Sequence, residues 1–141
     1  MSEKYNNYLQ FLKDRIYGYK GKFDEYIYYT PDFFQILCNL LDESVLSKNE
    51  KNMILCALGY FVAPNDVIPE EIYGPAGYID DIFLCCHVLK HLALQHGIEL
   101  IEQYWQEENE NFGEILESSY KNSKNALGTK AEQVLHYVGL N

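Results

Sequence analysis

The side chains that could do chemistry gather around one stretch of the chain, APNDVIPEEIYGPAGYIDD, residues 63–81. Between two apolar runs it places three prolines, two glycines and five carboxylates, which are Asp66, Glu70, Glu71, Asp80 and Asp81. His87 and His91 follow, four residues apart. On a helix both imidazoles could reach one divalent metal ion, with Asp80 or Asp66 as an oxygen ligand. Carboxylates also cap the backbone amides of turns, so the sequence allows a metal site or a structural loop.

The two adjacent aspartates are expected to differ in role. At about 100° per residue, Asp80, Leu84, His87 and His91 share one stripe of a helix, which faces solvent or an internal pocket. Asp81 points toward the apolar side, where a carboxylate must be hydrogen-bonded or neutralised. We therefore expect Asp80 to contact any ligand and Asp81 to accept backbone hydrogen bonds; a general acid or base with a raised pKa is the alternative for Asp81.

The elements that position these residues are helical, because apolar residues recur at helical spacing nearly throughout. The expected fold is one all-α domain over residues 1–141, of about five to six helices, with a central antiparallel helix pair joined by the loop rich in proline, glycine and aspartate. Expected helices cover residues 3–19, 31–42, 48–63 and 79–97, and a fifth begins at 98. A turn or two covers 115–120, a loop follows, and a short helix lies near 131–138.

Three helix starts carry capping signals. Thr30 before Pro31 is typical of an N-cap followed by a proline at the first helical position. Ser47 with Glu50 matches an S-x-x-E capping box, in which each residue satisfies the other's backbone amide. Thr129 precedes Glu132 at the same spacing, and it predicts a second capping box.

The loop also resembles a known family. Its motif residues are Tyr60, Pro64, Asp66, Ile68, Pro69, Gly77, Tyr78, Asp80 and Asp81. They resemble the YkvA-like family, a bacterial helical domain of unknown function, over about residues 54–92. The resemblance implies a fold more than an activity, and it marks Pro64, Asp66, Pro69, Gly77, Tyr78 and Asp81 as the structural loop motif. Glu70 stands where the family has an aspartate, and residues 74–76 lengthen the turn.

Composition narrows the class of protein. The chain has 141 residues, a net charge of −10 and eleven basic residues, so binding to nucleic acid is disfavoured. The start of the chain lacks a secretory signal and no apolar run reaches membrane-spanning length, so we expect a cytoplasmic protein without a membrane span. Cys38, Cys56, Cys85 and Cys86 lack metal-binding spacing and are expected to be reduced core thiols.

An unusual number of tyrosines, thirteen, suggests a contact surface. Aromatic residues with polar tips are favoured at protein interfaces, although they also pack the edges of small cores. The candidate partner contacts are Tyr17, Tyr19, Tyr26, Tyr28, Tyr29 and Trp105, and the acidic run Glu107, Glu108 and Glu110 lies beside Trp105.

These features favour a non-enzymatic protein-binding or regulatory domain whose partner is a protein, and a basic protein would suit the acidic charge. An inhibitor or immunity-like role fits the size and charge. The alternative is a small metal-dependent enzyme, a hydrolase that uses Asp66, Asp80, Asp81, His87 and His91. No cofactor other than a divalent metal is indicated, and the oligomeric state stays open.

Overall fold

The computed structural model describes residues 3–19, 24–62 and 77–140, and in these ranges every regular element is a helix. In chain order they are α1 (Glu3–Tyr17), η1 (Glu25–Tyr29), α2 (Thr30–Leu40), α3 (Lys48–Val62), α5 (Ile79–His96), α6 (Glu99–Glu102), α7 (Phe112–Leu127) and α8 (Lys130–Val138), where η1 is a 3₁₀ helix. The prediction of an all-α fold is confirmed. The loop motif residues Pro64, Asp66 and Pro69, with Glu70 and Glu71, lie outside the described residues.

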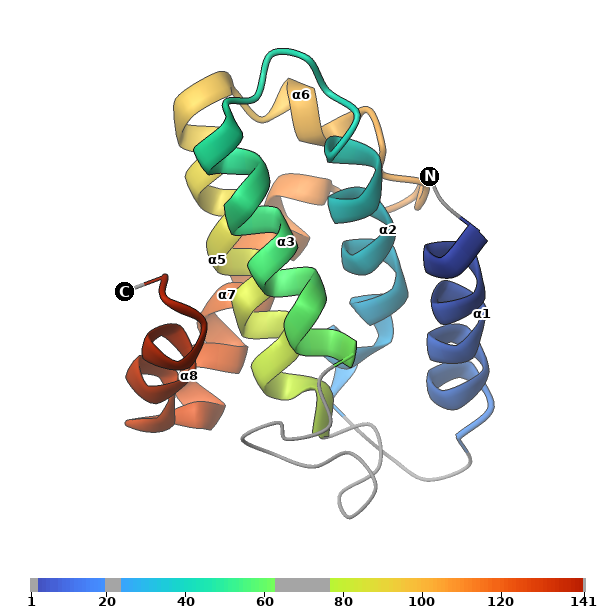
Figure 1. The fold of residues 1–141 in the computed structure, drawn as a ribbon. Helices are drawn as coiled ribbons and strands as arrows, with labels where there is room; N and C mark the ends of the chain where they lie inside the picture. Colours follow the sequence, from blue (N-terminus) through green and yellow to red (C-terminus); the bar gives the residue numbers. More distant parts are fainter. Residues whose placement is uncertain (1–2, 20–23, 63–76, 141) are drawn as a thin grey trace.

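Helix α5 forms the centre of the fold and packs on α2, α3, α6, α7 and α8. Its residues are buried on nearly every side through its first eleven positions, as expected for a helix that is apolar around most of its circumference. Helices α3 and α5 lie side by side and run in opposite directions (Figure 1). The central antiparallel pair is therefore present, and α7 covers the other face of α5 most extensively.

The helix bounds follow the sequence prediction for α1, α2, α3 and α5, within a few residues at each end. The predicted capping box at α3 is confirmed, because Ser47 N donates to Glu50 Oε1 at 2.8 Å and Glu50 N donates to Ser47 Oγ at 3.1 Å. At the end of α5, Gly97 has a φ of 89°, a left-handed value that glycine adopts without steric strain.

Two other predicted caps are wrong. Thr30 lies inside α2, and its hydroxyl donates to the Ile27 carbonyl at 2.6 Å, so it closes the preceding 3₁₀ turn. Thr129 has helical backbone angles and its side chain makes no capping hydrogen bond. In both places the preceding helix leads almost directly into the following one: η1 into α2, and α7 into α8. No residue with an extended backbone is therefore left to act as an N-cap.

The largest difference concerns the region after residue 111. The sequence predicts only a turn or two near 115–120 followed by a loop, whereas α7 runs unbroken from Phe112 to Leu127. Asn111 caps it by accepting a hydrogen bond from Glu114 N at 2.9 Å. Conversely, the predicted fifth helix is reduced to the short α6. Tertiary packing on α5 supports α7 in spite of its serine and asparagine content.

The prediction of core thiols is confirmed for three of the four cysteines. All four are free, with Cys38, Cys85 and Cys86 buried and Cys56 half-buried. Burial raises the pKa of the Cys38 thiol to about 12, so the thiol stays protonated and unreactive at neutral pH.

Candidate functional site

A continuous row of aromatic rings joins α1, η1 and the segment after α6. The ring centroids of Tyr17 and Tyr28 lie 4.8 Å apart, those of Tyr28 and Tyr29 5.8 Å, and those of Tyr29 and Trp105 5.7 Å. Phe112 continues the row at 5.3 Å from Trp105. Each separation is within the range at which aromatic rings attract one another.

Exposure to solvent divides the candidate contact residues into two groups. Tyr26 and Tyr29 are buried and belong to the core, whereas Tyr17 and Tyr28 are 44% and 45% exposed. Tyr19 is similarly exposed and Trp105 is half-buried. Tyr26 and Tyr29 therefore pack the core, and partner contact by the exposed tyrosines stays a prediction.

A carboxylate that the sequence analysis did not single out lies beside this row. Asp32 stands in the first turn of α2, it is half-buried, and its Oδ2 atom has no hydrogen-bond partner among the described residues. Burial and then the negative charge of Glu107 raise the pKa of Asp32 from 3.8 to about 7, and Lys13 opposes both effects. Burial and then Asp32 also raise the pKa of Tyr17.

These residues form one surface, which we call the acidic aromatic face: Tyr17, Tyr28, Asp32, Trp105 and Glu107. It brings together the tyrosine-rich segment and the acidic run, which the sequence analysis treated as separate candidates. The signal for Asp32 was weak, because an acid after Pro31 is typical of any helix start. Its burial depends on contacts that are distant in the sequence.

Asp80 and Asp81 of the loop motif are buried in the core. Tyr60 on α3 donates its hydroxyl hydrogen bond to Asp80 Oδ2 at 2.7 Å, and Asp81 N donates to Asp80 Oδ1 at 3.1 Å. Both aspartates are fully buried at the start of α5. The predicted burial of Asp81 is confirmed. Asp80, the expected ligand contact, links α3 to α5. Tyr78 and Gly77 of the same motif are also buried.

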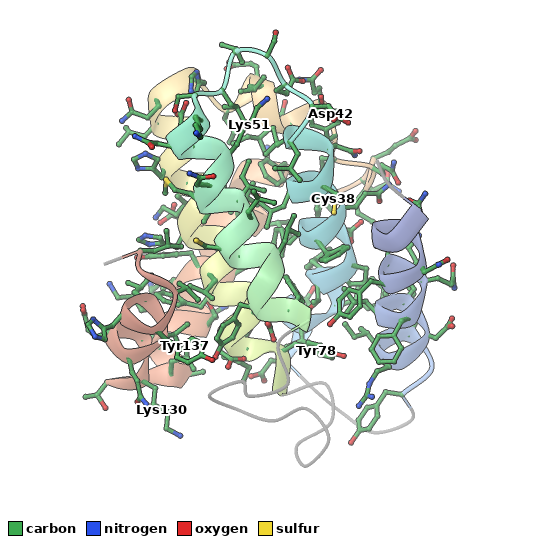
Figure 2. All side chains as sticks on the ribbon, viewed as in Figure 1. Cys38, Asp42, Lys51, Tyr78, Lys130 and Tyr137 are labelled. Atoms are coloured by element: carbon green, nitrogen blue, oxygen red, sulfur yellow. The ribbon has the colours of Figure 1, made fainter. Side chains whose placement is uncertain are left out.

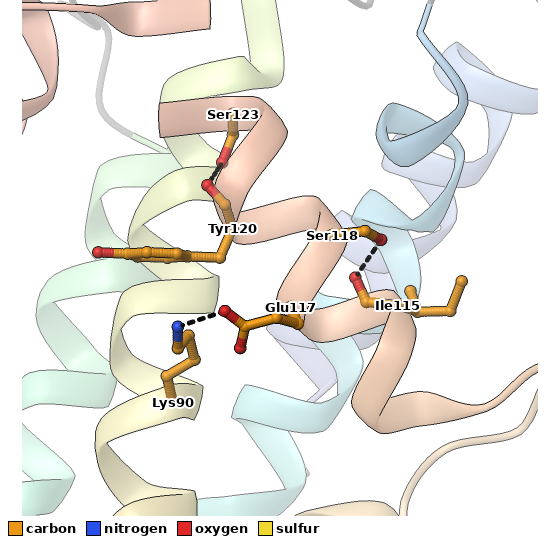
Figure 3. Close-up of polar contacts among 6 residues, drawn as sticks. All are labelled: Lys90, Ile115, Glu117, Ser118, Tyr120 and Ser123. Atoms are coloured by element: carbon orange, nitrogen blue, oxygen red, sulfur yellow. Dashed lines mark hydrogen bonds and ion pairs between the residues drawn. The ribbon is translucent and has the colours of Figure 1, made fainter. Parts of the chain in front are cut away.

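His87 and His91 lie farther along α5, and with Lys90, Leu94 and Tyr120 they line a hollow of about 310 Å³. His87 is half-buried and His91 exposed; burial and then His91 lower the pKa of His87. Lys90 lies 4.1 Å from the centroid of the Tyr120 ring and 3.0 Å from Glu117 Oε1 (Figure 3). These contacts hold the cation of Lys90 against α7.

The described residues do not supply a set of metal ligands. Within residues 3–19, 24–62 and 77–140, no group of three or more histidine, cysteine, aspartate or glutamate side chains is placed to hold a metal ion. Asp66 lies outside the described residues. A site that includes His87, His91 and Asp66 stays a prediction, as does the hydrolase that would use it.

The fold and its buried motif define a class of small all-α proteins built around a central helix pair. The model of DUF1232, a protein family of unknown function that includes YkvA, matches residues 50–86. The uncharacterized protein ORF9 of Methanothermobacter thermautotrophicus is 31% identical over 134 residues, which cover 95% of this chain and 91% of that protein. The chain therefore belongs to the DUF1232 family, and the resemblance seen in the loop motif is confirmed.

Two further relatives share only a segment. The E3 ubiquitin-protein ligases RNF170 of Xenopus laevis and Xenopus tropicalis are each 36% identical over 47 residues, which cover 31% of this chain but 18% of those proteins. No solved structure matches the chain. Among the described helices, none has the length and apolar character needed to cross a membrane.

Proposed function

We propose that this protein is a non-enzymatic binding domain that holds an arginine-bearing segment of a basic protein partner on its acidic aromatic face. The observation that supports the proposal best is the position of Asp32. Its carboxyl group is half-buried beside the exposed Tyr17 and Tyr28, and its pKa is raised to about 7. A carboxyl group in this state becomes ionised when a cation approaches, because the cation supplies the missing counter-charge.

The exposed rings suit the same partner. A guanidinium group stacks on tyrosine faces while it donates hydrogen bonds to carboxylates, and an ammonium group lacks the planar shape for both contacts. Tyr17 and Tyr28 supply the rings, and Asp32 and Glu107 supply the negative charge. The net charge of −10 would speed encounter with a basic partner over a longer range.

The relatives support a modular role. A 47-residue likeness to a longer protein named as an E3 ubiquitin-protein ligase covers 18% of that protein, so most of that protein lies outside the likeness. We take this as support for a binding or architectural unit, and we carry no ligase activity over to this chain.

Trp105 provides the test, since it is the chain's one tryptophan and its ring lies 5.7 Å from that of Tyr29. A short peptide with two arginines among glycines would be titrated while Trp105 fluorescence is recorded. Matched peptides would carry lysine or the uncharged isostere citrulline in place of arginine. We expect affinity in the order arginine, lysine, citrulline, with weaker binding at higher salt.

The variants Asp32→Asn and Tyr28→Ser should each weaken arginine-peptide binding about tenfold, the loss of one charge-assisted or stacking contact. Tyr137→Ser is the matched control, because Tyr137 is 58% exposed but lies on α8, across the molecule from α1 (Figure 2). Equal affinity for the arginine and citrulline peptides, or equal losses in Tyr28→Ser and Tyr137→Ser, would refute the proposal.

A further inference from the structure

Positively charged side chains gather around one hollow of this acidic chain, where α5 meets α7. The hollow has a volume of about 310 Å³ and is lined by His87, Lys90, His91 and Leu94 of α5 and by Tyr120 of α7. Lys124 lies beside it, because its Nζ atom is 5.6 Å from the centroid of the Tyr120 ring. We call this site the cationic hollow. Cationic groups that converge in a chain of net charge −10 favour an anion as the ligand.

The side chains of the cationic hollow are accessible to a ligand. Lys124 and His91 are exposed, and the Lys90 side chain is 33% exposed. Leu94 is 82% exposed, so the hollow also offers an aliphatic wall. A ligand that combines an anionic group with an apolar group would therefore meet a matching surface for each part.

The two lysines differ in how far their charge is already compensated. Lys90 Nζ lies 4.1 Å from the centroid of the Tyr120 ring and 3.0 Å from Glu117 Oε1 (Figure 3). Lys124 contacts the same ring, and within the part of the chain that the structure describes it forms no ion pair. Glu117 is 67% exposed, and an ion pair so open to solvent contributes little stability. An incoming anion can therefore share Lys90 with Glu117 and bind Lys124 as well.

The half-buried imidazole of His87 experiences the positive charge of this group. Burial, then His91, and then Lys124 and Lys90 lower the pKa of His87, while a hydrogen bond to the Leu140 backbone opposes them. A positive field that disfavours a proton on this ring favours an anion beside it. The same arrangement thus makes His87 a reporter of anion binding.

We propose that the cationic hollow binds a small soluble phosphate monoester. The phosphate group would contact Lys90, Lys124 and His91, and the organic group would contact Leu94. A phosphate monoester carries about −1.5 to −2 charges at neutral pH and has three acceptor oxygens, so it can accept from several donors at once. The net charge of −10 disfavours approach to an anionic membrane surface, which favours a soluble ligand.

The probe is phenyl phosphate, titrated into the full chain while the imidazole signals of His87 and His91 are followed by ¹H–¹³C NMR. We expect saturable shifts with a dissociation constant of about 1 mM, which is within reach of so small a ligand. Inorganic phosphate lacks the apolar group and phenyl sulfate carries a single negative charge, so each should bind about fivefold more weakly. His96 does not line the hollow and contacts Glu50 instead, so its signals should not shift.

Binding should also change the protonation of His87. The bound anion offsets the positive field of Lys90 and Lys124, so saturating phenyl phosphate should raise the pKa of His87. The pH titration of the His87 signals with and without phenyl phosphate measures this change. A pKa of His87 that is the same in both titrations would overturn the proposal.

Three variants identify the contacts, and one serves as a control. Lys124→Gln should weaken phenyl phosphate binding about fivefold, and Lys90→Gln about tenfold, because the second change also leaves Glu117 unpaired. Glu117→Gln should strengthen binding about threefold, since it releases Lys90 from its ion pair. Lys48→Gln is the matched control, because it removes one positive charge from an exposed lysine on α3 that does not line the hollow. Melting temperatures would establish that all four variants are folded.

Absence of saturable shifts up to about 20 mM phenyl phosphate would overturn the proposal. Equal losses in Lys124→Gln and Lys48→Gln, or weaker binding by Glu117→Gln, would overturn it as well. Co-sedimentation with phosphatidic acid vesicles, without binding of phenyl phosphate, would overturn it in favour of a membrane surface. Arginine-peptide binding at the acidic aromatic face is measured by Trp105 fluorescence, so failure at one site is distinguishable from failure at the other.

Discussion

Replacement of Asp32 by asparagine should change how the stability of the protein depends on pH. The pKa of Asp32 rises from 3.8 to about 7 on folding, so the folded state holds this proton more tightly than the unfolded state. The stabilisation linked to Asp32 is therefore complete below the unfolded pKa near 3.8 and is lost as the pH rises through about 7. Asp32→Asn stays neutral at every pH and should show no such loss.

The magnitude follows from competing effects at this carboxyl group. Each unit of difference between the folded and unfolded pKa values corresponds to about 1.4 kcal/mol of stability. Without solvent screening, the rise from 3.8 to about 7 would therefore correspond to about 4 kcal/mol. Asp32 is only half-buried, and solvent screens part of that energy, so we expect about 1–2 kcal/mol. The position at the start of α2 favours the charged form by about 0.3–1 kcal/mol, which burial and Glu107 outweigh.

The assay is urea denaturation of the wild type and of Asp32→Asn at pH 5, 6, 7 and 8. Relative to the wild type, the variant should gain stability progressively between pH 5 and 7 and level off by pH 8, with a change of about 1 kcal/mol over this range. Other titrating groups are common to both proteins and cancel in the difference. Parallel stability profiles would refute the reasoning, because they would mean that Asp32 titrates alike in the folded and unfolded states.

Three further predictions concern binding affinity and stability. Arginine-peptide affinity should rise from pH 5.5 to 8 in the wild type, as Asp32 loses its proton, and should stay flat in Asp32→Asn; a flat wild-type profile would contradict the role given to Asp32. Tyr60→Phe should cost about 1–3 kcal/mol of unfolding free energy by urea denaturation, because buried Asp80 loses this donor, whereas exposed Tyr137→Phe should cost less than about 0.5 kcal/mol; equal costs would count against the Tyr60–Asp80 bond. Backbone and side-chain hydrogen bonds from Ser47 lower the pKa of Glu50, as does His96 Nε2 at 2.7 Å. The stability linked to Glu50 is therefore present above its unfolded pKa of 4.5 and lost as the pH falls, and Glu50→Gln should remove that acid sensitivity in melting curves.

The parts of the fold that were predictable are those with local causes. The Ser47 and Glu50 capping box is a reciprocal pair within one turn, so its spacing alone predicts it. The central place of α5 follows from apolar residues around its circumference. Helix α7 was missed because its serines and asparagines favour turns in isolation, while packing of Ser119 and Ser123 against the core decides the outcome.

The candidate site was predictable only in outline. The density of tyrosines in residues 17–29 marked the region, but nothing in the spacing separates the exposed Tyr28 from the buried Tyr29, since η1 has a 3₁₀ geometry that alternates differently from an α-helix. Asp32 was missed because its raised pKa depends on burial and on Glu107, which the fold brings near it from far along the chain. Asp80 was predicted to contact a ligand because the periodicity of a single helix does not reveal contacts with a neighbouring helix. In the structure its partner is Tyr60 on α3.

The central place of α5 bears on how the family segment can be reused. Residues 50–86 include most of α3 and only the first part of α5, which is buried on nearly every side at those positions. A two-helix hairpin can cover one face of such a helix, and here α2, α7 and α8 cover the rest. A chain that carries this segment within a different sequence must therefore supply replacement helices for those faces. The same buried motif could then lie beneath a different outer surface in each chain that carries it.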